Sequence, residues 1–145
     1  MKFEKMKAPL LESFHVNPRI KIAALWTGVM FCYIYGDYFG LYVPGKVHGL
    51  LETDNMLGSP LKLFIAAFLL ALPAMMIFLS VMLGPRLCKW LNIGVAAFFT
   101  LFTLLVGISS IDAWHGFYVF YSFLESIITI VILVQVWRWP KVKAN

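Results

Sequence analysis

Four segments of the chain are long and apolar enough to cross a lipid bilayer, and this feature constrains the fold more than any other. They cover about residues 22–39, 63–83, 90–111 and 113–137. A hydrocarbon core of about 30 Å needs about 20 residues of helix. The apolar runs are continuous instead of alternating, which favours helices over the strands of a membrane barrel. The sequence therefore predicts an all-α integral membrane protein.

The overall composition excludes the other classes of protein. Of the 145 residues, 61% are hydrophobic and 13% are charged, whereas a soluble domain is about 45–50% apolar and about 25% charged. A soluble domain of this length has too small an interior to hide so many apolar side chains. Two cysteines are too few for a disulfide scaffold. We expect a single transmembrane domain over residues 1–145, with an outer loop at about residues 40–62.

The positions of the basic residues predict the orientation. Only Lys46 and Lys62 fall on one side of the predicted spans, whereas the other ten of the twelve basic residues flank the opposite side: Lys2, Lys5, Lys7, Arg19, Lys21, Arg86, Lys89, Arg138, Lys141 and Lys143. The positive-inside rule then places both termini in the cytoplasm. This predicts an antiparallel four-helix bundle, N-in and C-in. Anionic membrane lipids are sufficient partners for the net charge of +5, so no nucleic acid is expected.

Glu125 lies near the middle of the fourth predicted span. A carboxylate at that depth costs at least a few kcal/mol unless it is paired, protonated or in contact with water. Polar residues recur around it at helical spacing, with Tyr121 alongside: His115, Tyr118, Ser122, Glu125 and Thr129. This face predicts either a polar cavity or proton relay, or a neutral glutamic acid that joins two helices by a hydrogen bond. Glu125 is our first candidate functional residue.

Asp37 ends a shallower polar stripe on the first span, after Trp26, Met30 and Tyr33. It is level with His115 and Tyr118, so it could pair with His115 or with a tyrosine if the first and fourth helices touch. The alternative is an aspartate that reaches water at the outer interface. Candidate catalytic residues are Glu125, Asp37 and His115, and the predicted ligand-binding set is Glu125, Tyr118, Ser122, His115, Tyr33, Asp37 and Trp26.

Other polar residues carry weaker signals. Thr100 and Thr103 on the third span are typical of close helix packing. Asp112 is predicted to cap the fourth helix. His48 and Glu52 are spaced i, i+4, which suits either a metal-binding or acid–base pair or an exposed surface pair. Two ligands do not make a metal site, and neither a metal nor a cofactor is predicted.

The segment Phe31–Lys46 (FCYIYGDYFGLYVPGK), the run Met75–Ser80 and a Glu-centred last span that ends in Trp137–Pro140 resemble a family of small bacterial four-helix membrane proteins catalogued as a domain of unknown function. The resemblance implies a bacterial inner-membrane location and a four-helix fold, and it implies no activity. A looser likeness to DoxX-like proteins rests on architecture alone.

Several functions are compatible with these features. The leading hypothesis is a bundle that binds a small or lipid-like hydrophobic ligand in a polar pocket open toward the outer leaflet. The alternatives are a membrane enzyme that performs acid–base chemistry on an isoprenoid, quinone or sterol-like lipid, a proton-coupled four-helix transporter, and a non-catalytic accessory subunit. The pattern is compatible with a monomer or with a homo-oligomer.

Overall fold

The computed structural model describes residues 15–52 and 57–139, and all the regular elements in these ranges are helices. Four of the five helices are long, and each predicted span falls on one of them. The prediction of an all-α chain is therefore confirmed. The predicted outer loop also contains a short helix, α2, and the five helices in order are α1 (Pro18–Gly40), α2 (Lys46–Leu51), α3 (Pro60–Met82), α4 (Pro85–Ser109) and α5 (Gly116–Trp137).

Within the described ranges, three helices are long and apolar enough to cross a membrane, and these are α3, α4 and α5. The helix α1 has the same length as α3, but its second half includes Asp37 and three tyrosines. It is therefore less apolar than the other three long helices. That residues 22–39 form a fourth span stays a prediction.

The starts of the long helices follow local rules. The side chain of Asn17 accepts a hydrogen bond from the backbone N–H of Arg19, and that of Ser59 accepts one from Lys62. These contacts cap α1 and α3. Proline occupies the first turn of α1, α3 and α4, where its missing N–H costs no helical hydrogen bond. Gly45, which precedes α2, has a φ of 78°, a conformation that glycine adopts without strain.

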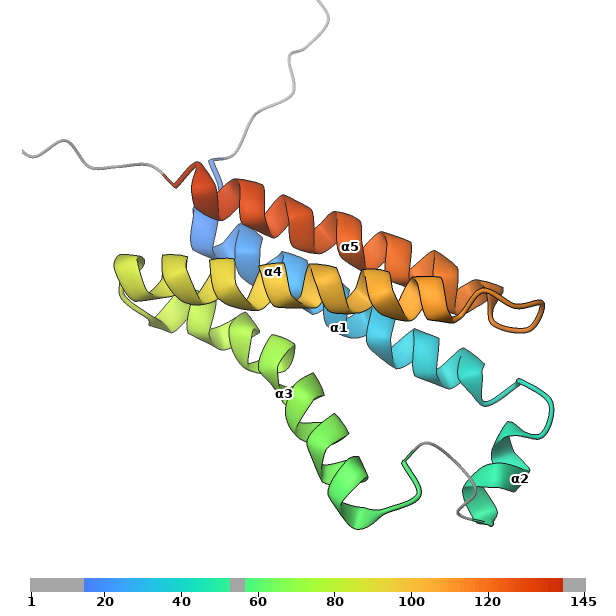
Figure 1. Ribbon diagram of the computed structural model, residues 1–145. Helices are drawn as coiled ribbons and strands as arrows, with labels where there is room; N and C mark the ends of the chain where they lie inside the picture. The colour runs from blue at the N-terminus through green and yellow to red at the C-terminus, as the bar shows by residue number, and fades with distance from the viewer. Residues whose placement is uncertain (1–14, 53–56, 140–145) are drawn as a thin grey trace, which may run out of the picture.

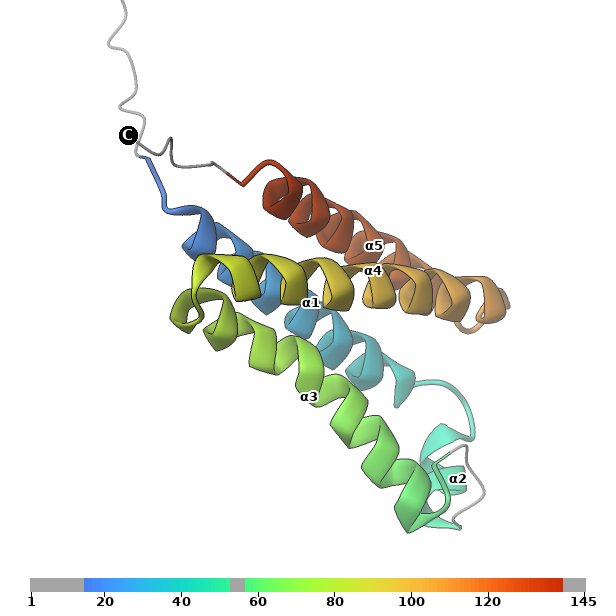
Figure 2. The same cartoon turned by 60° about the vertical axis from the view of Figure 1, so that its left-hand side comes forward.

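The long helices alternate in direction, and the two ends of the described chain lie at the same end of the molecule (Figure 1). The helix α5 packs against α4 and α1, and α3 packs against α1 and more sparsely against α4. Both views show α3 diverging from α4 and α5 toward its own N-terminus, beside α2 (Figures 1 and 2). The molecule is consequently tightly packed at the end that holds the chain ends and more open at the other.

The packed end contains the core. Trp26 of α1 and Phe99 of α4 are fully buried, and their rings meet edge to face with centroids 6.4 Å apart. Apolar side chains from all four long helices surround them: Ile22, Val29, Met76, Ala96, Ile132 and Val136. On α1 the buried residues follow a helical stripe, as expected for a helix with one face toward the core.

The buried side chain of Asn92 joins three helices within this core. Its Oδ1 accepts a hydrogen bond from Trp26 Nε1 of α1 at 2.7 Å. Its Nδ2 lies 3.2 Å from Ser80 Oγ of α3 and donates to the Cys88 carbonyl of α4 at 2.9 Å. All the polar atoms of the amide are satisfied, so this network fixes α1, α3 and α4 together at the packed end.

The outward faces of the helices are apolar. Large side chains on α3, α4 and α5 are more than half exposed, including Phe64, Phe68, Leu101, Leu105 and Phe123. Soluble proteins rarely expose so extensive an apolar surface. Together with three helices long and apolar enough to cross a bilayer, this surface is compatible with a membrane protein.

Replacing Asn92 tests the network. We expect Asn92→Leu to lower the free energy of unfolding by about 1–3 kcal/mol, because it leaves Trp26 Nε1 without its partner and removes the contact with Ser80 Oγ. The measurement is unfolding of the full chain by sodium dodecyl sulfate in mixed micelles. The control is Gln135→Leu, which also replaces a side-chain amide by leucine but at an exposed position of α5, and it should leave stability nearly unchanged. Equal effects of the two substitutions would contradict the role given to Asn92.

Candidate functional site

A cavity of about 360 Å³ occupies the open end of the molecule, where α3 diverges. It is bounded by the second half of α1, the first half of α3, the second half of α4 and the first half of α5. Lys46 of α2 and Leu57 also contribute to its wall. Its polar lining includes five of the seven residues predicted to bind a ligand: Tyr33, Asp37, Tyr118, Ser122 and Glu125.

Glu125 lines this cavity from the middle of α5 and is only 4% exposed. Within the described part of the chain, its carboxyl group has no hydrogen-bond partner. The neighbouring hydroxyls bond to one another instead: Thr103 Oγ1 and Ser126 Oγ are 3.0 Å apart, and Thr100 Oγ1 and Thr129 Oγ1 are 2.8 Å apart. These pairs join α4 to α5, so the helix contact is made without Glu125, whose carboxyl is left to the cavity.

Tyr33 lines the cavity from α1, and its ring packs beside Phe99 at the border with the core. Its hydroxyl oxygen is buried and has no hydrogen-bond partner among the described residues. A buried hydroxyl without a partner costs about 1–3 kcal/mol. Native proteins keep few such groups, so each one calls for an explanation. The buried Tyr33 hydroxyl on α1 and the Glu125 carboxyl on α5, neither with a hydrogen-bond partner among the described residues, thus line the same cavity.

Two glycines allow the helices to approach each other around this cavity. A Cβ atom at Gly107 of α4 would lie 2.9 Å from the Cβ of Ser122, a distance that real Cβ atoms do not show. A Cβ at Gly40 of α1 would lie 2.6 Å from Tyr118 Oη. Gly107 therefore sets the close contact of α4 with α5, and Gly40 gives room to the Tyr118 hydroxyl.

His115 does not line the cavity. Its Nδ1 lies 2.6 Å from Asp112 Oδ2, in the turn before α5, and its ring stacks on that of Tyr118 at 5.8 Å between centroids. The suggested pair with Asp37 is therefore replaced by a local one.

The backbone N–H of Trp114 and the His115 side chain hold the pKa of Asp112 below its usual range. Asp112 itself is not the cap residue that we predicted, because α5 begins after His115 and Asp112 instead closes the preceding turn.

Trp26 also lies away from the cavity. It is fully buried in the packed end, where its indole N–H is used by Asn92. Helical spacing put Trp26 on the same face as Tyr33 and Asp37, but it lies about two turns from Tyr33 and about three turns from Asp37 along α1. At that distance the stripe passes from the cavity into the core.

Several lining residues were missed by the sequence reasoning. Lys46 lies in the short helix α2, and its isolated positive charge after the Pro44–Gly45 turn is the signal that could have found it. Phe102 of α4 and Leu69 of α3 are apolar residues in apolar spans, so no local signal distinguishes them. Cys32 also lines the cavity, although no role was predicted for it.

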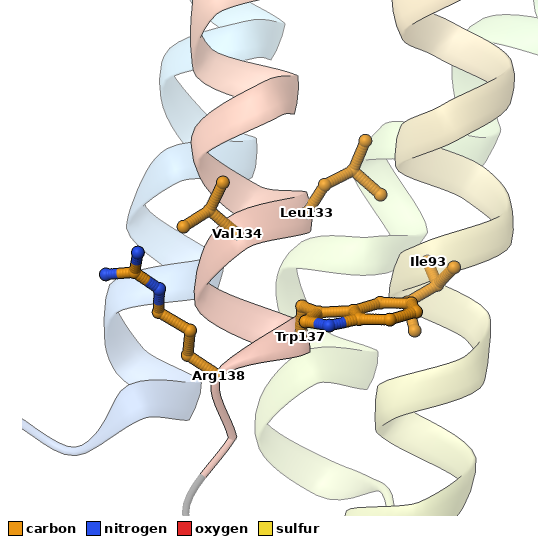
Figure 3. Close-up of a pocket in the computed structure, with 5 residues that line it drawn as sticks. All are labelled: Ile93, Leu133, Val134, Trp137 and Arg138. Atoms are coloured by element: carbon orange, nitrogen blue, oxygen red, sulfur yellow. The ribbon is translucent and has the colours of Figure 1, made fainter.

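Two further features, a side-chain pair on α2 and a second hollow, lie outside this cavity. His48 Nδ1 and Glu52 Oε2 are 3.3 Å apart on α2, with side chains 73% and 63% exposed, which matches the interpretation as a surface pair. A second hollow of about 480 Å³ lies on the outer side of α4 and α5 (Figure 3). Leu133, Val134, Trp137 and Ile93 supply its apolar wall, and the guanidinium of Arg138 points away from Trp137.

Comparison with known proteins places the chain in a family without assigning it an activity. The model of a family described as "Family of unknown function (DUF6326)" matches residues 10–144. No curated protein and no solved structure matches the chain. The likeness to DoxX-like proteins finds no support in these comparisons, whereas the resemblance to a family of unknown function is confirmed.

The unpartnered hydroxyl of Tyr33 leads to a testable contrast. Tyr33→Phe removes a buried group that has no hydrogen bond to lose, so the free energy of unfolding should stay the same or rise by up to about 1 kcal/mol. Thr129→Val removes a bonded hydroxyl of the α4–α5 contact, and we expect it to lower that energy by about 1 kcal/mol. Unfolding in mixed micelles measures both. An equal loss in the two variants would show that Tyr33 has a partner.

Proposed function

The chain belongs to the DUF6326 family, whose function is unknown, and from its cavity we propose that it is a membrane protein that binds a small or lipid-like ligand between its helices. The observation that carries this proposal is Glu125, which is 96% buried, makes no hydrogen bond within the described residues and lines a cavity of about 360 Å³. That volume lies within the range of small-molecule sites, about 300–1,000 Å³.

The energetics of Glu125 favour a ligand over simple packing. A carboxyl group in the apolar part of a bundle is costly unless a partner or water reaches it. Helix packing at this level is already provided by the two hydroxyl pairs of α4 and α5. A ligand that enters the cavity would supply the missing partner to Glu125 and to Tyr33 together. The residues proposed to contact it are Glu125, Tyr118, Ser122, Tyr33 and Asp37, with His115 behind Tyr118.

We further propose that all four long helices cross a bacterial inner membrane as an antiparallel bundle with both termini in the cytoplasm. The support is the basic charge near the packed end, where Arg19, Lys21, Arg86, Lys89 and Arg138 lie. Lys2, Lys5, Lys7, Lys141 and Lys143 belong to the same flanks but lie outside the described residues. In this orientation the cavity is in the outer half of the membrane.

Reporter fusions to the two termini test this topology. Green fluorescent protein fused to either terminus should fluoresce in a bacterial host, because it folds in the cytoplasm, and alkaline phosphatase at the same positions should be inactive. An alkaline phosphatase fusion between Leu51 and Leu57 should be active. The reverse pattern, or activity of the phosphatase at a single terminus, would contradict the four-span topology.

The test of ligand binding is to identify small molecules that stay with the protein. We expect a hydrophobic molecule to copurify with the full chain in mild detergent, at about one per chain, and to be lost from Glu125→Gln. Mass spectrometry of the extracts measures this. The matched control is Glu52→Gln, the same change at an exposed position, which should keep the molecule. Identical extracts from all three proteins would refute the proposal.

One observation favours an enzyme as the second candidate. Asp37 of α1 and Glu125 of α5 line the same cavity from different helices, as acid–base chemistry on an isoprenoid, quinone or sterol-like lipid would require. An enzyme would convert the copurified molecule over time, whereas a binding protein would release it unchanged. The same mass spectra, recorded after incubation, distinguish the two.

A further inference from the structure

We infer that the ligand of this cavity is an amphiphilic organic cation, whose ammonium-type head lies between Glu125 and the tyrosines and whose apolar part lies against α3. This inference rests on the proposed function and specifies its ligand class. It follows from three properties of the cavity, which are its unbalanced charge, its aromatic lining and the position of its apolar wall.

The charges that line the cavity are unequal. Asp37 and Glu125 are acidic, and Lys46 is the basic residue of the lining. Lys46 lies close enough to Asp37 for their opposite charges to attract each other. Glu125 lies about three helical turns into α5, and it has no cationic partner among the described residues. The unmatched group of this site is therefore an acid, and a cation is the ligand that would balance it.

Aromatic rings from two helices line the polar part of the same cavity. Tyr33 contributes from α1, and Tyr118 and Tyr121 from α5. The face of an aromatic ring attracts a cation, with an energy that rises when water is excluded. An anionic head would instead meet these rings and two carboxyl groups, an arrangement that is unfavourable for it. A neutral head would leave Glu125 without a counter-charge.

The rest of the wall is apolar and comes from the helix that diverges. Ala66, Leu69 and Leu70 of α3 line the cavity together with Phe102 and Val106 of α4. Since α3 packs only sparsely against α4, hydrocarbon has a place between the two helices. A cation with an apolar chain would thus satisfy Glu125 at one end and cover Leu69, Leu70 and Phe102 with the other.

The test compares three probes of equal chain length and different head. Decyltrimethylammonium, decanoate and decanol are each titrated, below the concentration at which they form micelles, into the full chain in phosphatidylcholine nanodiscs. Equilibrium dialysis measures binding, and empty nanodiscs correct for partition into lipid. We expect saturable binding of about one decyltrimethylammonium per chain and none of decanoate. The affinity for decyltrimethylammonium should fall about tenfold or more in Glu125→Gln and stay unchanged in Glu52→Gln.

The outcomes separate this inference from the proposed function. If decanoate or decanol saturates a site that Glu125→Gln weakens, the cavity binds ligands but the inference of a cation is wrong. If none of the probes saturates, both are overturned. The comparison of cation with anion uses the wild-type chain alone, so it decides the inference even where Glu125→Gln fails to fold.

Discussion

The side chain of Asn92 is the contact on which the shape of this molecule depends. It holds α1, α3 and α4 together at one end, because a single amide uses its oxygen for Trp26 and its nitrogen for Ser80 and Cys88. In lipid the apolar faces of helices gain little by contact with each other, so buried polar bonds and close packing decide where helices meet. The helix α3 is fixed by this network near its C-terminus and diverges beyond it.

The cavity is a consequence of that divergence. On the other side of the bundle, Thr100 with Thr129 and Thr103 with Ser126 keep α4 against α5, and Gly107 brings the two helices close at Ser122. The helices α4 and α5 therefore stay together while α3 diverges, and Glu125 and Tyr33 line the space that this divergence leaves. The polar bonds that hold the fold are thus separate from the polar groups that are free to meet a ligand.

Much of the helical architecture could be predicted from the sequence, because length, apolarity and breaking residues are local properties. Proline and glycine mark the starts of helices, and each of the four apolar segments forms a helix. The stripe of His115, Tyr118, Ser122 and Glu125 also follows from helical spacing. The partners of these residues were not predictable in the same way. His115 joins Asp112 within its own turn, and Trp26 joins Asn92, which is 66 positions away.

The sequence by itself determined four apolar helical segments, a strongly one-sided basic charge and a single acid deep in the last segment, because each of these depends only on residue type and spacing. The tertiary structure alone decided that Glu125 lines a cavity and not a helix contact, and that the stripe on α1 divides into a core residue, Trp26, and two cavity residues, Tyr33 and Asp37. The physical reason is that a side chain's environment depends on which helices lie beside it at its own depth. That is set by the contacts of Asn92 and of the hydroxyl pairs, which join residues far apart in the chain.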